Sequence, residues 1–364
     1  MKADRFQELA SAAGPFASVY FEDTHTTEDA AKVAELTWRA ISEKLEELGV
    51  SDEVRAHVER AVTEGPTPVG TGGRAVVANA DRVWVDERLV RPPLQTEVRW
   101  SDGPYLIPLV EHGSRGRPHL VVRVDHVGAD LTVHDRNGAV VHEETVEGDD
   151  HPVHKASGAQ TPGYGDPEPP VEEQRRRNIA KVAERVTELA DEHGTDPVFL
   201  IGEVRSRNDL ADALVSRTAE VAVQVETGSR AEGSDPAQTR AALDEGLAQR
   251  RLAEMDEAAE RFRAGAGTGL AVEGLAEVTA ALRERRVESL IIGDLGDATV
   301  LVGDDPSVVA QDSDALSAMG SENERVCRAD EALPVAAAVT GADRLVRIDE
   351  RLSPADGIAA LLRY

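Results

Sequence analysis

The sequence predicts an α/β protein built from three α/β domains. Its 364 residues are enough for more than one hydrophobic core, and 41% hydrophobic with 30% charged residues is typical of a soluble globular chain. Segments with apolar residues at helical spacing alternate with short β-type runs, which is the pattern of α/β domains. We place an N-terminal α/β domain at 1–116, a middle domain at 117–230 with a long loop at 151–172, a charged helical connector at 231–264 and a compact C-terminal α/β sandwich at 265–364.

The N-terminal domain begins with a short helix from Asp4 to Ala12 and a strand, PFASVYFE. Apolar residues at helical spacing then predict a helix that ends at Gly49. Its apolar face consists of Ala34, Trp38, Ile41, Leu45 and Leu48. A second helix is expected from Asp52 to Thr63, followed by two strands in RAVVANADRVWVDERLV that join near Asn79. The segment EVRWSDGPYLIPLVEHG completes the domain.

Three β-type runs open the middle domain: LVVRVD, ADLTVHD and AVVHEETV. Asn137-Gly138 lies between the last two runs, and this dipeptide is a strong hairpin signal. After the long loop, apolar residues at helical spacing predict an amphipathic helix from Glu172 to Glu192. The run PVFLIGEV is apolar throughout, as expected of a central strand. A helix capped by Asn208 and a strand, EVAVQVET, follow.

A strongly charged helix from Asp235 to Arg263 leads to the C-terminal domain. Gly265, Gly267 and Gly269 are expected to end this helix, because the glycines of a dinucleotide fingerprint follow a strand. Beyond them we predict strands in SLIIGDL, TVLVG and RLVRID. Helices are predicted around Asn323 to Thr340 and in the closing segment DGIAALLRY.

The stretch HPVHKASGAQTPGYGDPEPPVEEQRRRN, from His151 to Asn178, is rich in Gly and Pro. Its prolines lack backbone donors and its glycines permit positive φ, so the segment is expected to form an exposed arm. A loop of this length inside a domain is usually functional or disordered. Arg175, Arg176 and Arg177 are placed at the start of the next helix, where positive charge opposes the macrodipole by roughly 0.3–1 kcal/mol each. We therefore expect an anionic partner, such as a phosphate backbone.

The hairpin sheet, the loop with Gly158-Ala159-Gln160 and the Arg-rich helix resemble the middle domain of archaeal and eukaryotic class-one release factors, whose loop carries Gly-Gly-Gln. The stretches GPFASVYFEDTHTTEDA, VHKASGAQTPGYGD, GEVRSR, RADEALPVAAA and DGIAALLRY resemble bacterial and archaeal members of that superfamily, in particular the Balon-type ribosome hibernation factors of the actinobacterial kind. Ala159 departs from the Gly-Gly-Gln pattern. Since hibernation factors of this kind release no peptide, the departure argues against hydrolysis.

The resemblance implies an RNase-H-like middle domain and a stress-response factor that occupies the aminoacyl site of idle ribosomes and binds rRNA. The N-terminal domain would face the decoding region, the arm would extend toward the peptidyl-transferase centre, and the C-terminal domain would contact elongation factor Tu or its archaeal counterpart. The residues expected to bind the ribosome are His154, Lys155, Ser157, Gly158, Ala159, Gln160, Tyr164, Arg175, Arg176 and Arg177. Tyr164 would stack on a base, a contact worth about 1–3 kcal/mol, or pack within the loop.

Two alternatives stay open. In the first, the chain is a peptidyl-tRNA hydrolase or release factor in which Gln160 positions water at the ester. In the second, it is a stress-induced binding module without ribosome contact, because a net charge of −28 is unusual for a protein that binds RNA. We favour a cytoplasm of high salt, where charge is screened over about 3 Å at molar concentration.

Other site types find little support. Cys327 is the single cysteine, which excludes an intramolecular disulfide and a cysteine-rich zinc site. Asp125, Glu143 and Glu203 are the only carboxylates that we nominate for a two-metal nuclease, and solvated surface is the better interpretation. Neither a cofactor nor a metal is expected. With no apolar run of about 20 residues and no secretory signal, the protein is expected in the cytoplasm.

Overall fold

The computed structural model describes residues 1–24, 30–64, 72–113, 118–135, 140–148, 168–226, 236–318, 320–321 and 324–364. Its contacts separate the chain into two compact units. Unit 1 combines Met1–Ser114 with Arg251–Tyr364, and unit 2 is Arg115–Arg250. The division into an N-terminal domain, a middle domain, a connector and a C-terminal domain stays a prediction.

The first part of unit 1 is an antiparallel sheet in the order β3-β2-β1-β4. Its elements are η1 (Asp4–Phe6), α1 (Gln7–Ala10), β1 (Phe16–Glu22), α2 (Ala30–Glu47), α3 (Asp52–Glu64), β2 (Gly73–Ala78), β3 (Val83–Leu89), β4 (Glu97–Ser101) and α4 (Ile107–His112). Side chains alternate across a strand, so Val19 and Phe21 of β1 join the core formed with α2 and α3. Phe16 and Tyr20 join a second core that extends into the C-terminal part.

The second part of unit 1 contains a four-stranded sheet in the order β10-β16-β11-β15 and a small sheet in the order β13-β12-β14. Its elements are α8 (Pro236–Ala266), whose end belongs to this unit, β10 (Ala271–Glu273), α9 (Leu275–Arg283), β11 (Val287–Ile292), β12 (Thr299–Val302), β13 (Val309–Ala310), α10 (Ser313–Ser317), β14 (Arg325–Arg328), α11 (Ala329–Thr340), β15 (Arg344–Arg347), η2 (Ala355–Gly357) and β16 (Ile358–Leu362).

The predicted closing helix is wrong, because its residues form strand β16. This strand pairs antiparallel with both β10 and β11, and all five of its residues are buried. Ile358 and Ala360 pack in one core, whereas Ala359 and Leu361 pack with α8 in another. A short apolar run covered on both sides cannot be distinguished from a buried helix by periodicity. The helix predicted from Asn323 also begins later, since β14 precedes α11.

Unit 2 is a five-stranded sheet in the order β7-β6-β5-β8-β9. Its elements are β5 (His119–Val124), β6 (Gly128–His134), β7 (Val140–Glu147), α5 (Glu168–His193), β8 (Val198–Gly202), α6 (Val204–Ala213), α7 (Ser216–Glu220) and β9 (Ala222–Val225). The strands β5, β6 and β7 are antiparallel, and β8 and β9 run parallel to β5. Numbered within the unit, the order is 3-2-1-4-5, as in an RNase-H-like fold.

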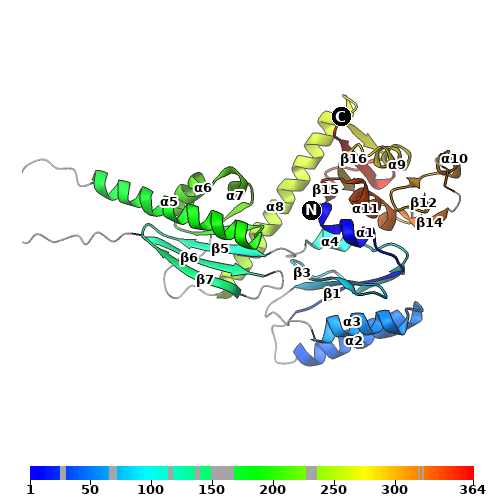
Figure 1. Cartoon of the computed structure of the whole chain (residues 1–364), viewed down its shortest axis with the longest axis horizontal. Coiled ribbons are helices and arrows are strands. Elements are labelled where there is room, and N and C mark those ends of the chain that lie inside the picture. Colours follow the sequence, from blue (N-terminus) through cyan, green and yellow to red (C-terminus); the bar gives the residue numbers. More distant parts are fainter. Residues whose placement is uncertain are drawn as a thin grey trace, which may run out of the picture. The chain divides into compact units, whose positions relative to one another are not determined.

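Helix α5 packs against the sheet of unit 2 and extends past the strand ends (Figure 1). Ile179, Val186 and Leu189 supply part of its buried face. The helix begins at Glu168, earlier than predicted, because proline is tolerated in a first turn, where backbone donors lack helical partners. Asn208 is not a cap, since it lies inside α6.

Among the helices of the described residues, none combines the length and apolar character that crossing a membrane requires.

Candidate functional site

The end of β7 is held against α5 at Gly148. Its backbone N–H donates to Val127 O at 2.8 Å, in the turn between β5 and β6. A side-chain Cβ at position 148 would lie 2.2 Å from Cγ of Asn178 and 2.4 Å from Val127 O, so only glycine fits. Asn178 is buried on α5 and donates through Nδ2 to His126 O at 3.4 Å. The end of β7 is therefore fixed against α5 beside Asn178.

Two further contacts secure this anchor. Gln174 donates through Nε2 to Oδ1 of Asn178 at 3.1 Å, one helical turn away. Lys181 donates through Nζ to Glu147 O at 2.9 Å. This anchor was not predicted from the sequence. The only available signal was a polar Asn178 at a position where the helical pattern requires a buried residue.

Arg175 faces α6. Its Nη2 lies 2.6 Å from Oδ2 of Asp209, and the arginine side chain is only 13% exposed. The close approach is an ion pair without hydrogen-bond geometry, and Nε also has no hydrogen-bond partner among the described residues. Because Arg175 is enclosed and paired inside unit 2, it is poorly placed to meet an external phosphate.

Arg176 and Arg177 are exposed on α5. Arg177 pairs with Glu173 one turn earlier, and both side chains are about two-thirds exposed. Glu172 pairs with Arg205 at 2.7 Å. In the described part of the chain, Arg176 has neither an ion pair nor a hydrogen bond. Of the three arginines, it is therefore the one without an ion-pair partner among the residues that the structure describes.

The predicted helix-dipole penalty is wrong in its premise. The three arginines lie about two turns inside α5, whereas the dipole effect is confined to the first turn. Their anionic neighbours are Glu173 and Asp209, so two of the three charges are compensated within the unit. The arm candidates His154, Lys155, Ser157, Gly158, Ala159, Gln160 and Tyr164 lie outside the described residues.

The nominated carboxylates are dispersed. Asp125 accepts from the backbone N–H of Val127 and Gly128 at 2.7 and 2.9 Å, which stabilises the turn after β5. Glu143 lies opposite Thr132 on β7, and Glu203 precedes α6. No group of three or more His, Cys, Asp or Glu residues placed to hold a metal occurs within the described ranges.

An ion-pair network joins the middle of β7 to α5. Arg185 contacts both oxygens of Glu144, at 2.6 and 2.9 Å, and Nε2 of His142 lies 3.0 Å from Glu144. The hydrogen bonds from Arg185, and a smaller one from His142, lower the pKa of Glu144. This network holds α5 on β7.

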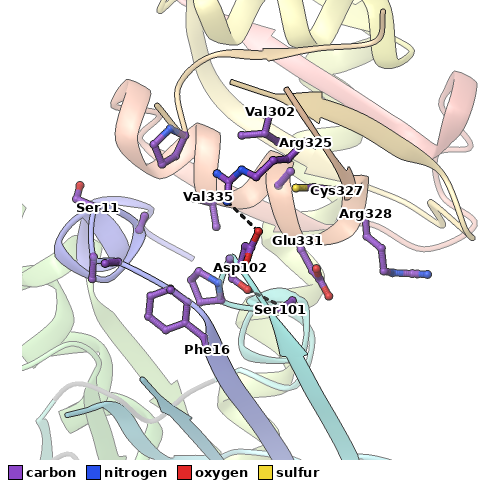
Figure 2. Close-up of a pocket in the computed structure, with 18 of the residues that line it drawn as sticks. Ser11, Phe16, Ser101, Asp102, Val302, Arg325, Cys327, Arg328, Glu331 and Val335 are labelled. Carbon is purple, nitrogen blue, oxygen red and sulfur yellow. Dashed lines mark hydrogen bonds and ion pairs between the residues drawn. The ribbon is translucent and has the colours of Figure 1, made fainter. Parts of the chain in front are cut away.

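Unit 1 contains a pocket of about 520 Å³ beside β14. Figure 2 shows Arg325 and Asp102 facing each other across it, and their side chains are 2.8 Å apart. Burial raises the pKa of Glu331, although Arg99 lies 3.2 Å away. Burial also raises the pKa of the Cys327 thiol, which keeps it protonated and weakly nucleophilic. Cys327 in this pocket is therefore not an activated nucleophile.

Together, these features define a multi-domain α/β protein with an RNase-H-like unit, in which Gly148 at the end of β7 is held against α5. A model of the bacterial archaeo-eukaryotic release factor family 2 matches residues 118–268. The chain is 43% identical over 366 residues to uncharacterized proteins of two Mycobacterium tuberculosis strains, CDC 1551 / Oshkosh and ATCC 25618 / H37Rv, covering 100% of this chain and 97% of the relatives. The protein belongs to this family of bacterial proteins related to archaeo-eukaryotic release factors.

Solved structures of low identity were also found. Archaeal translation termination factor aRF1 is 15% identical, with 99% of this chain and 95% of that chain covered and a TM-score of 0.24. Archaeoglobus fulgidus Pelota is 16% identical, with 100% and 92% covered and a TM-score of 0.34. TM-scores of this size do not establish a shared arrangement.

Proposed function

We propose that this protein is a ribosome-binding hibernation factor. It occupies the aminoacyl site of idle ribosomes and blocks translation without releasing peptide. The observation that carries the proposal is the match of a release factor family model to residues 118–268, a range that includes almost all of unit 2. A factor that acts as a plug needs a rigid body and an anchored extension, but no reaction centre.

Unit 2 supplies such a body. The base of the extension is fixed at Gly148 by Val127 and Asn178, and α5 continues beyond this point to Glu168. Arg176 on α5 is exposed and has no ion-pair partner among the described residues, so its charge is proposed to meet a phosphate of rRNA. Arg175 and Arg177 are proposed to support this surface, since both already pair with carboxylates.

The absence of peptide release is proposed from Ala159. A Cβ at this position adds bulk where the related tripeptide has only glycine, while Gly158 and Gln160 remain. Their retention is the observation that favours the alternative function, a peptidyl-tRNA hydrolase or release factor. In that case Gln160 would position the attacking water.

The remaining contacts are proposed by family resemblance. The N-terminal domain would face the decoding region, and the C-terminal domain would bind a translational GTPase, elongation factor Tu or its archaeal counterpart. Pelleting with and without that GTPase in its GTP form tests the second contact. Equal ribosome binding in the two cases would remove the GTPase from the proposal.

The central experiment is sedimentation of the full chain with vacant 70S ribosomes at several potassium concentrations, followed by a peptide-release assay on ribosomes that carry peptidyl-tRNA. We expect cosedimentation without release. Release that Gln160→Ala abolishes would establish the hydrolase instead. Failure to pellet at every salt concentration would favour a binding module that does not contact the ribosome.

Arg176→Gln tests the surface itself. Loss of one charge-assisted contact should weaken binding by about 1–2 kcal/mol. The matched control is Arg217→Gln, because Arg217 is also an exposed helical arginine of unit 2, with a side chain that is 70% exposed, and it takes part in none of the proposed contacts. Equal affinities for the two variants would exclude Arg176 from the interface.

A further inference from the structure

Basic side chains gather around the C-terminal end of α4 in unit 1. Arg347, the last residue of β15, has Nε 3.4 Å from Oε2 of Glu111 and donates through Nη1 to the carbonyl of Ile292 at 3.2 Å. Val90 N–H donates to Gly113 O at 2.9 Å, which brings the neighbouring Arg91 beside the end of this helix. Glu111 therefore contacts Arg347, and Arg91 follows a residue that is bonded to the end of the same helix.

Helix α8 contributes the third arginine, Arg251. Arg344, at the start of β15, lies 3.6 Å from both Glu254 and Glu257 of α8, so the helix runs beside this strand. Arg251 lies one turn before Glu254 on α8. In the described part of the chain, Arg251 has neither a hydrogen bond nor an ion pair, although it is partly buried.

The local electrostatics agree with this geometry. Burial lowers the pKa of Arg251, Glu111 opposes the effect, and Arg91 and Arg347 add to it. Burial also lowers the pKa of His112. Glu111 acts to raise that pKa, whereas Arg251 and Arg91 lower it further. Two separate groups therefore experience neighbouring positive charge, in a protein with a net charge of −28.

We propose that Arg91, Arg251 and Arg347 form a binding site for one phosphate group. Guanidinium groups bind phosphate oxygens through directed N–H donors. A doubly charged anion would offset the repulsion among the three arginines, because the neighbouring carboxylates Glu111 and Glu254 supply only two negative charges. The phosphate belongs either to a free phosphate ion or to the backbone of RNA. The proposal goes beyond the ribosome contacts inferred for unit 2, because all of these residues lie in unit 1.

The first test is the unfolding temperature of the full chain in potassium phosphate and in potassium chloride at equal ionic strength and pH. Binding to the folded state should raise the midpoint by about 2–4 °C when phosphate exceeds its dissociation constant about tenfold. Phosphate also stabilises proteins in general by exclusion from their surface. The deciding quantity is therefore the difference between variants.

Arg251→Gln should lose the specific part of the shift in unfolding temperature. Arg39→Gln should keep it, because Arg39 is an exposed arginine on α2, away from the proposed site. Arg91→Gln serves as a second variant, because Arg91 is exposed and its replacement should not disturb the fold. If Arg251→Gln and Arg91→Gln retain the full phosphate-dependent shift, the site does not exist.

A second test identifies the source of the phosphate. Binding of a labelled single-stranded RNA oligonucleotide is measured as a function of salt concentration. If RNA supplies the phosphate, Arg251→Gln should reduce the slope of log K against log salt by about 0.7 relative to Arg39→Gln. An unchanged slope with a lost phosphate shift would assign the site to the free ion. Pelleting of Arg251→Gln with ribosomes is measured separately, because it tests the proposed ribosome binding and not the phosphate site.

Discussion

Nη2 of Arg175 lies 2.6 Å from Oδ2 of Asp209, and this contact joins α5 to α6 within unit 2. It gives neighbouring arginines on one helix different tasks. Arg175 has a side chain that is 13% exposed and holds two helices together, whereas Arg176 is exposed and available to a partner.

Arg175→Ala should therefore reduce stability, and Arg176→Ala should not. The first change removes the partner of Asp209, whose side chain is 41% exposed, so we expect a loss of about 1–2 kcal/mol rather than the full cost of a buried charge. The second should stay within about 0.5 kcal/mol of wild type. Urea denaturation measures both, and equal midpoints would contradict the division of roles.

Deleting Ser157 to Asp166 should leave the fold unchanged. The two ends of the intervening segment are Gly148, which contacts Asn178, and Glu168, which lies about 15 Å along the helix from Asn178. Residues 149–167 number nineteen, and the nine that remain after deletion can span about 30 Å when extended. Circular dichroism and the unfolding temperature test this expectation. A large drop in unfolding temperature would mean that the deleted residues pack on the protein.

Gly148→Ala should destabilise unit 2. The new Cβ would approach Cγ of Asn178 and the carbonyl of Val127 to well under contact distance, so backbone or helix must shift. Overpacking of this kind costs about 1–3 kcal/mol. Gly267→Ala is the matched control, because a Cβ there meets no atom within 4 Å. Similar unfolding midpoints for both variants would show that the anchor is adaptable.

His112 should make stability depend on pH. Burial lowers its pKa below the ordinary value of 6.5, so the unfolded chain takes up a proton at a higher pH than the folded chain does. Stability from this group is present above about pH 6.5 and is lost as pH falls through the folded pKa. Its charged neighbours are Glu111, Arg91 and Arg251. Unfolding in chloride buffer should lose part of its pH slope in His112→Gln, and an unaltered slope would exclude the histidine.

Much of the fold followed from local pattern. The hairpin strands β6 and β7, the amphipathic face of α5 and the fully apolar β8 were predicted where the structure has them. These elements repeat their apolar residues with a period near 2 or 3.6, or are apolar throughout. Helix ends were less predictable. The start of α5 at Glu168 and the position of Asn208 inside α6 depend on how neighbouring parts of the chain pack.

The sequence by itself determined the α/β class, the family resemblance and the position of the Gly-Ala-Gln segment, because these depend on periodicity and residue order. Only the tertiary structure decided that Ile358 to Leu362 is a strand, because pairing on both edges outweighs the helical preference of Ala and Leu. The tertiary structure also decided which arginines form ion pairs within the protein. Arg175 acquires Asp209 from a different helix, and no local pattern specifies a partner across space.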